Sequence, residues 1–359
     1  MSEPIFIARQ DTLEQEILPV HWLAQYKLFG EESYTFQDKG IWKKLCMSSA
    51  AANDRDMHAE ALEEMLTTFS AEHTGKWMLT VYGMEAAVLE GLASMAAIAA
   101  SGTAMGAIAD NALLMHAIAN SETAMQRIAN SQTAMQRVAN NRGAMDAIGR
   151  SRIARDAVQA SPYYNSYIKE NSMAIAKFAV ALASLESAGY SSMAGVAADS
   201  TAMNAVAASS TAMNAVAASG VALKAIAKAY KNTANMLQFL RAVNASDTLV
   251  KSIYSTLTNA TTLFNAAQLG SQDGVADANS WATTSAAPNA FLACACGYYN
   301  SGGANVDVTY NGTVIAQNKT GTRQPGSVTS TNVNAITMAP STFTENGDGW
   351  LAVQKFTAK

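Results

Sequence analysis

Histidine and glutamate come together in one segment near the start of the chain, where they could bind a metal or exchange protons. His58, Glu60, Glu63 and Glu64 lie in a stretch from Arg55 to Phe69 that we expect to be an acidic helix. His58 and Glu63 are not at a same-face spacing, whereas Glu60 with Glu63 and Glu64 is ordinary for an exposed helix face. We therefore expect a solvated face here rather than a metal site.

Three cysteines are too few for a disulfide framework. Cys46 stands alone, while Cys294 and Cys296 alternate in the strand-like run 291–296 and would share one face of a strand. We interpret them as small buried hydrophobic residues, because a metal site needs more ligands. This cysteine usage is typical of a protein kept in a reducing cytosol.

A carbohydrate-cleaving site would need a pair of carboxylates, and the acids of the C-terminal region are Asp307, Glu345 and Asp348. Because Glu345 and Asp348 lie in turn-like sequence, we do not expect them to catalyse a reaction. The chain has no phosphate-binding loop, nucleophile elbow or zinc motif, so we expect neither an enzyme nor a cofactor.

Aromatic residues of the same region are candidates for surface contact, since aromatic rings suit both sugar faces and protein interfaces. A place in the core is the alternative for each of them. The candidates are Tyr298, Tyr299 and Trp350.

The elements that must position these residues are organised around a ten-residue unit, Ser-x-Thr-Ala-Met-x-x-Ile/Val-Ala-x. Its apolar positions, seen in Ala124, Met125, Ile128 and Ala129, share one face of a helix, and Ala, Met and Gln favour helix over strand. We expect the repeat core to consist of Met105, Ile108, Met115, Ile118, Met125, Ile128, Met135, Val138, Met203, Val206, Met213 and Val216.

A single continuous helix would not keep this stripe in register, because ten residues at about 100° each leave it about 80° out of phase. Asn120-Ser121 and Asn130-Ser131 are good helix caps at the joins between units. We therefore favour short helices joined by tight turns and stacked into an α-solenoid. A bundle of parallel chains with an unusual supercoil is the competing arrangement.

The composition excludes several classes of protein. Only 14% of the 359 residues are charged and the net charge is −4, so we expect no general nucleic-acid surface. No apolar run reaches the length of a membrane span, and the start of the chain does not resemble a secretion signal. Six arginines are concentrated in the first repeat block: Arg127, Arg137, Arg142, Arg150, Arg152 and Arg155. We interpret them as a solvated outer face, and a stripe that binds an acidic partner is the alternative.

The regions that flank the repeats differ from them in composition. Residues 1–90 are rich in tryptophan and acidic clusters and suggest a small mixed docking domain. After the repeats, we interpret an apolar series as capping helices: Leu237, Leu240, Leu249, Ile253, Leu257 and Leu263. Residues 306–316 predict a hairpin around Asn311-Gly312, and we expect further strands at 328–336 and 350–356, with a turn at 347–349.

This three-part layout, together with the decapeptides of residues 200–219, resembles virion proteins of tailed bacteriophages, particularly tail-fibre and other appendage proteins. The resemblance covers residues 91–230 and the order of the regions. It implies assembly on the virion as an oligomer, often a trimer in fibres. The α-helical repeat departs from the β-structured shaft of many fibres, which leaves trimerisation open.

We therefore expect a multidomain α + β protein with an antiparallel β-sandwich-like end. Its regions are 1–90, an attachment domain; 91–160, a first repeat block; 161–190, an insert; 191–270, a second repeat block with capping helices; 271–290, a linker; and 291–359, a β-domain.

The expected function is that of a non-enzymatic structural protein of the virion, made in the host cytoplasm. Its expected partners are other virion proteins, further copies of itself and a host-surface glycan or protein, without nucleic acid or membrane insertion. A bacterial surface adhesin with a repeat stalk and a carbohydrate-active appendage enzyme are the alternatives.

Overall fold

The computed structural model describes residues 95–269, 279–283, 290–298, 303–323, 327–347 and 349–358. The predicted docking domain at 1–90, including the His58 cluster and Cys46, lies outside the described residues. The chain divides into two compact units, and the boundary falls between Ile168 and Lys169, within the predicted insert.

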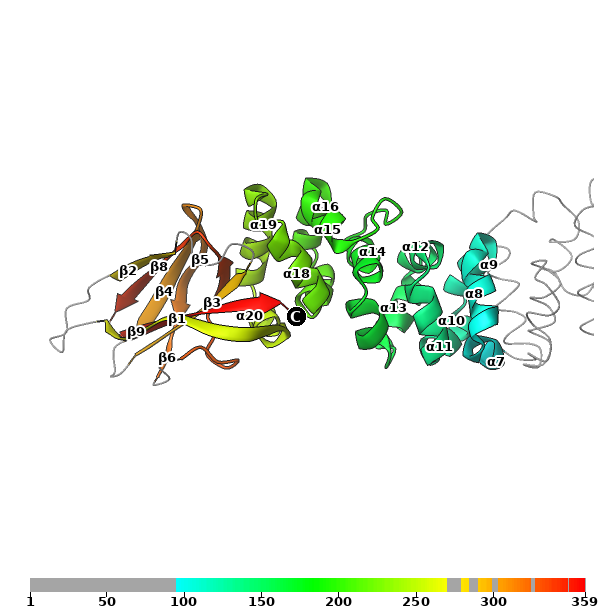
Figure 1. The fold of residues 1–359 in the computed structure, drawn as a ribbon, viewed down its shortest axis with the longest axis horizontal. Helices are drawn as coiled ribbons and strands as arrows, with labels where there is room; N and C mark the ends of the chain where they lie inside the picture. The colour runs from blue at the N-terminus through cyan, green and yellow to red at the C-terminus, as the bar shows by residue number, and fades with distance from the viewer. Residues whose placement is uncertain are drawn as a thin grey trace, which may run out of the picture. The chain divides into compact units, whose positions relative to one another are not determined.

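The decapeptides of the first unit are helical, as predicted, and each forms one short helix (Figure 1). A π-helical turn, η3 (Asn165–Lys169), follows them. The helices are α7 (Met95–Ala100), α8 (Gly102–Asp110), α9 (Ala112–Ala119), α10 (Glu122–Ala129), α11 (Gln132–Ala139), α12 (Arg142–Arg150) and α13 (Arg152–Ala160).

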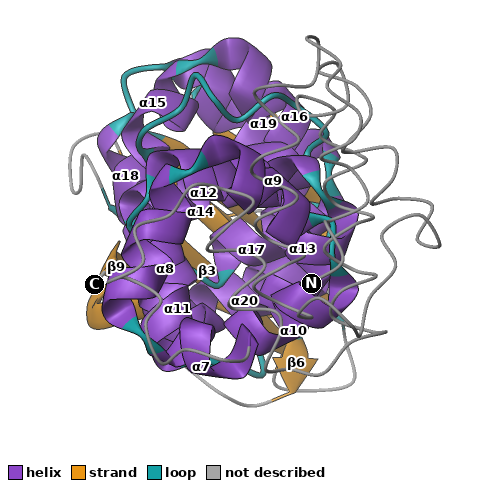
Figure 2. Cartoon of the chain, turned by 90° about the vertical axis from the view of Figure 1, so that its right-hand side faces the viewer, coloured by secondary structure: helices purple, strands orange, loops and turns teal. Residues whose placement is uncertain are grey.

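Capping explains why every unit restarts as a new helix. Ser121 has an extended backbone, with φ −97° and ψ 117°, and its hydroxyl accepts a hydrogen bond of 3.1 Å from the backbone N–H of Ala124. Asn111 ends α8 and begins α9, so one residue forms the whole joint. Figure 2 shows such connections in teal between the purple helices. Each cap contributes about 1 kcal/mol to helix stability.

Each helix of the first unit contacts the next helix in sequence and also the third one along. Thus α10 contacts α7 and α13, α11 contacts α8, and α12 contacts α9. The side chains of Ala124, Met125, Ile128 and Ala129 are buried, which is the face that the sequence predicts.

Serine hydroxyls at the joints also bond to a helix four units back in the sequence, as from Ser131 at the start of α11 to α7. Ser131 Oγ donates a hydrogen bond of 2.6 Å to the carbonyl oxygen of Ala99, and Ser161 Oγ donates one to that of Ala129. A single serine therefore caps its own helix and satisfies a carbonyl at the end of a helix in the preceding layer.

The second unit continues the helical pattern. Contacts again join α14 to α17, α15 to α18, α16 to α19 and α17 to α20. The helices are α14 (Ser172–Leu182), α15 (Met193–Ala198), α16 (Ser200–Ala208), α17 (Ser210–Ala217), α18 (Gly220–Lys228), α19 (Thr233–Asn244) and α20 (Asp247–Thr256).

Strands follow α20 directly and form two small, mainly antiparallel sheets. One has the order β1-β9-β3-β6, with β7 also paired to β3, and the other has the order β2-β8-β4-β5. The strands are β1 (Leu257–Leu269), β2 (Asn279–Thr283), β3 (Phe291–Tyr298), β4 (Ala304–Tyr310), β5 (Thr313–Thr320), β6 (Thr322–Arg323), β7 (Ala335–Met338), β8 (Ser341–Gly347) and β9 (Gly349–Ala358).

The series expected to form capping helices is helical from Leu237 to Ile253, in α19 and α20. The expectation is wrong for its last two members, Leu257 and Leu263, because both belong to strand β1. β1 pairs antiparallel with β9 from Leu257 opposite Ala358 to Leu269 opposite Gly349. Its threonines are β-branched and favour a strand over a helix. Strand β2 likewise lies within the stretch expected to be a linker.

The predicted hairpin is confirmed. Strands β4 and β5 meet at Asn311 and Gly312, whose φ angles are 48° and 76°, as a tight two-residue turn requires. The predicted strand at 350–356 is part of β9. The one expected at 328–336 begins only at Ala335, because Asn332 Oδ1 accepts a hydrogen bond of 2.6 Å from the N–H of Thr329 and forms a turn.

Within the second unit, a buried amide connects helix and sheet. The side chain of Asn244, at the end of α19, donates a hydrogen bond of 2.7 Å to the carbonyl oxygen of Ile336 and accepts one of 3.0 Å from its N–H. Both backbone groups of a residue in β7 are thus satisfied by one side chain.

Candidate functional site

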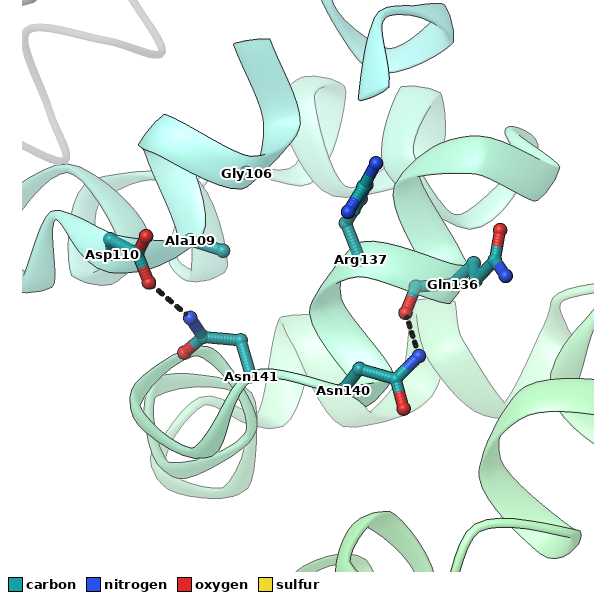
Figure 3. A pocket seen from close by; sticks show the side chains of 7 residues that line it. All are labelled: Gly106, Ala109, Asp110, Gln136, Arg137, Asn140 and Asn141. Atoms are coloured by element: carbon teal, nitrogen blue, oxygen red, sulfur yellow. Dashed lines mark hydrogen bonds between the residues drawn. The ribbon is translucent and has the colours of Figure 1, made fainter. Parts of the chain in front are cut away.

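A polar pocket of about 320 Å³ lies between α8 and α11 in the first unit (Figure 3). Helix α8 stands above it, and the end of α11 with the joint to α12 forms the opposite side. The residues that line it are Gly106, Ala109, Asp110, Gln136, Arg137, Asn140 and Asn141.

The pocket exists because one repeat unit lacks a side chain where its neighbours have one. The repeat units of α8 to α11 each have a methionine at the same place. The residue that follows this methionine is Gly106 in α8, whereas it is His116, Gln126 and Gln136 in the following units. A Cβ atom added to Gly106 would have no neighbouring atom within 4 Å, so the space beside the glycine is open.

Hydrogen bonds hold most of the polar wall in place. The side chain of Asn141 caps α12 by accepting a bond of 2.9 Å from the N–H of Ala144, and its amide donates one of 2.6 Å to Asp110 Oδ1. The amide of Asn140 donates a bond of 2.9 Å to the carbonyl oxygen of Gln136. These bonds fix the positions of the Asn140 and Asn141 side chains in the wall.

Arg137 differs from these residues. Its exposed guanidinium forms no hydrogen bond or ion pair with any residue in the described part of the chain. A Cβ atom on Gly102 would lie 3.3 Å from Arg137 Nη2, so the arginine lies close against a glycine of α8. Figure 3 shows Arg137 and Asp110 on opposite sides of the space below Gly106.

The lining supplies one guanidinium, one carboxylate and three amides, and it contains no serine, cysteine or histidine. Such a set can bind a polar molecule by charge and hydrogen bonding but has no nucleophile activated by a base. Its chemistry is that of binding rather than catalysis. The sequence analysis does not identify this pocket. The one signal that could indicate it is a glycine, Gly106, at a position held by larger side chains in α9 to α12.

The predicted surface contacts at the C-terminal end are only partly available. Tyr298 is half-buried at the end of β3, and Tyr299 lies outside the described residues. Trp350 is fully buried, with its indole against Gly297 of the paired strand, where an added Cβ would lie 2.2 Å from Nε1. Trp350 is therefore a core residue and not a surface contact.

The two described acids of the β-region do not form a catalytic pair. Glu345 lies opposite Val306 on the paired strands β8 and β4, whereas Asp307 lies opposite Thr344. Neighbouring residues of a strand point to opposite faces, so the two carboxylates lie on opposite faces of the sheet. Asp348 lies outside the described residues.

Cys294 and Cys296 lie in β3, and both are buried free thiols. Burial, and secondarily the charge of Glu345, raises the pKa of Cys296 to about 12. Burial raises the pKa of Cys294 well above its usual value. At neutral pH both are protonated and poor metal ligands. Among the described residues, no group of histidine, cysteine and acid side chains is placed to hold a metal ion.

The repeat-core residues predicted from the sequence are all buried, with exposed fractions of at most 1%. The arginines of the first repeat block are exposed, apart from Arg155, which is half-buried. Arg155 donates a hydrogen bond to the carbonyl oxygen of Gly149.

No known protein family matches this chain, and no curated protein matches it either. Within the described ranges, no helix is both long enough and apolar enough to cross a membrane.

Proposed function

We propose that this chain is a non-enzymatic structural protein of a tailed-phage virion, a tail fibre or another appendage. In this proposal residues 1–90 attach to other virion proteins, the decapeptide helices act as a spacer, and the C-terminal β-region, arranged as a sandwich, contacts the host surface or the virion. The observation that carries it is the regular connection between helices three units apart.

The spacer is proposed to be a solenoid with three helices in each turn. Its support is the contact of each helix with the third one along, together with inter-helix hydrogen bonds that join residues 32 positions apart, as in Ser131 to Ala99 and Ser151 to Ala119. Met125 and Ile128 are fully buried within a single chain, so these side chains of the described repeats are not available to pack in a bundle of chains.

The proposed sandwich rests on contacts between the two sheets. Strand β3 of one sheet contacts β4 of the other, and β9 contacts β8 in the same way. Large side chains of both sheets, Phe291, Phe343 and Trp350, are fully buried, as expected for residues that face each other across a shared core.

Deleting repeat residues from the full chain tests the spacer. Removal of 121–130, one complete unit, should preserve the helical content per residue and a cooperative thermal transition in circular dichroism, because the flanking units still stack. Removal of 126–130, half a unit, should lower the helical content per residue and the cooperativity of the thermal transition. The reason is that it puts the buried face and the capping residues out of register with the neighbouring units. Equal effects of the two deletions would overturn the solenoid.

The virion assignment is tested separately by mass spectrometry of density-purified phage particles. The chain should be present in a fixed ratio to the other virion proteins. Its presence in infected cells but absence from the particles would overturn the assignment. Light scattering on the purified chain then gives its mass; a trimer is the expectation for a fibre, and a monomer would assign it to a decoration, collar or adaptor.

A further inference from the structure

We propose that the pocket between α8 and α11 binds a small hydroxylated carboxylate with the size and polarity of a sugar acid. This binding function goes beyond the spacer role and does not depend on it. Three features of the pocket support it: the glycine that borders it, an arginine in it that no residue of the described ranges engages, and its size.

One glycine in the interior of a short helix borders the open space of the pocket. Gly106 lies in α8, where a glycine costs roughly 1 kcal/mol relative to alanine. Alanine at 106 would meet no atom within 4 Å, so packing does not demand the glycine there. A glycine that lowers helix stability and that packing does not require is expected where function needs a space to stay open.

The next stack of helices provides an internal comparison. At the corresponding position of α9 the chain has His116, whose Nε2 lies 3.2 Å from the amide nitrogen of Asn120. A side chain at this position can therefore fill the space beside its helix and contact the residue that ends the same helix. Among the described units α8–α13, only α8 has a glycine at this position. The wall of the pocket opposite α8 includes an arginine, Arg137.

The charges of the pocket define the ligand. Arg137 presents a planar guanidinium that is not engaged by any residue in the described ranges, and a carboxylate is its best-matched planar partner. On the other side, Asp110 uses Oδ1 to accept from Asn141, and a carboxylate oxygen can also accept a hydrogen bond from a ligand hydroxyl. A ligand that spans the pocket therefore carries an anionic group at one end and hydroxyl donors at the other (Figure 3).

The size agrees with this chemistry. A volume of about 320 Å³ lies at the lower end of the range for small-molecule sites, which is about 300–1,000 Å³. No aromatic side chain lines the pocket, so a large apolar or stacked ligand finds no matching surface there.

The test uses the full chain and isothermal titration with D-glucuronate, which carries both the carboxylate and the hydroxyls. D-glucose supplies hydroxyls without charge, and acetate supplies charge without hydroxyls. We expect glucuronate to bind at least about tenfold more tightly than either, because only it engages both ends of the pocket. Failure of glucuronate to bind, or equal binding of all three, would overturn the proposal.

Variants then locate the binding. Gly106→Gln places in α8 the residue that α10 and α11 carry at the same position, so it should melt at least as high as the parent while weakening glucuronate binding at least about tenfold. Arg137→Gln should weaken glucuronate binding similarly and remove the preference over glucose. Gly195→Ala in α15 is the matched control, because it changes a helical glycine whose added Cβ would contact none of the lining residues; it should leave binding unchanged. Undiminished binding by a folded Gly106→Gln chain would overturn the assignment to this pocket.

Discussion

Ser151 Oγ donates a hydrogen bond of 2.5 Å to the carbonyl oxygen of Ala119 and accepts one of 3.3 Å from the N–H of Ala154. Ser151 is buried, and Ala119 is completely so. One hydroxyl therefore satisfies a donor at the start of α13 and an acceptor at the end of α9. This dual use makes the serine of the decapeptide more than a helix cap.

Ser151→Ala should lower the free energy of unfolding by about 2 kcal/mol, because it removes the cap and leaves the buried carbonyl of Ala119 unsatisfied. Ser101→Ala is the control: Ser101 caps α8 through a bond of 3.2 Å to the N–H of Ala104, and no inter-helix bond from it is found in the described chain. It should cost about 1 kcal/mol. Urea denaturation measures both, and equal losses would contradict the dual role.

Asn244→Ala should destabilise the second unit by about 2–4 kcal/mol, because it leaves the N–H and the carbonyl of Ile336 buried without their side-chain partner. The control is Asn214→Ala, at an exposed position of α17, which should change stability by less than about 0.5 kcal/mol. Chemical denaturation followed by circular dichroism compares the two. A loss at Asn244 no larger than that at Asn214 would show that the amide is not needed between helix and sheet.

Gly297→Ala should destabilise the β-region by about 3 kcal/mol, since the new Cβ would lie 2.2–2.3 Å from atoms of the Trp350 indole. Gly303→Ala, where a Cβ would meet nothing within 4 Å, is the matched control and should be nearly neutral. Gly297→Ala should cost less stability in the Trp350→Leu variant than in the parent protein. Additive losses in this double-mutant cycle would contradict direct contact.

Alkaline pH should destabilise the protein partly through its buried thiols. Burial, with a smaller effect from Glu345, raises the pKa of Cys296 to about 12, and burial raises the pKa of Cys294 well above its usual value. The unfolded chain releases these protons from about pH 8.5, so the stabilisation is complete below that pH and is lost as the pH rises toward the folded pKa values.

The measurement is urea denaturation between about pH 8 and pH 11, comparing the parent with Cys294→Ala/Cys296→Ala. The parent should lose stability more steeply, by up to about 1.4 kcal/mol per pH unit for each thiol. Tyrosine ionisation affects both proteins and cancels in the difference. Parallel pH profiles would show that the thiols do not contribute.

Local patterns in the sequence predict part of this fold correctly. The helices of the decapeptides follow from the spacing of residues such as Met125 and Ile128 and from caps such as Ser121, and the hairpin follows from Asn311-Gly312. In these cases a few neighbouring residues determine the conformation.

Features that depend on distant partners were not predictable in the same way. Leu257 continues the four-residue spacing of Leu249 and Ile253, which suits a helix, whereas the pairing of β1 with β9 depends on residues far along the chain. The burial of Trp350 depends on Gly297 in another strand, and the pocket depends on Arg137 lying near a glycine of α8. Sequence spacing alone does not show such pairs.

Hydrogen bonds that reach only 32 residues back along the chain also have a kinetic consequence. Closing a segment of that length costs little entropy, so folding of the first unit can begin at any group of neighbouring helices and extend in both directions. No single nucleus is then indispensable. Backbone amides at the outer helices of the array should exchange with solvent sooner than those of α10 and α11, giving a gradual rather than a uniform pattern of protection.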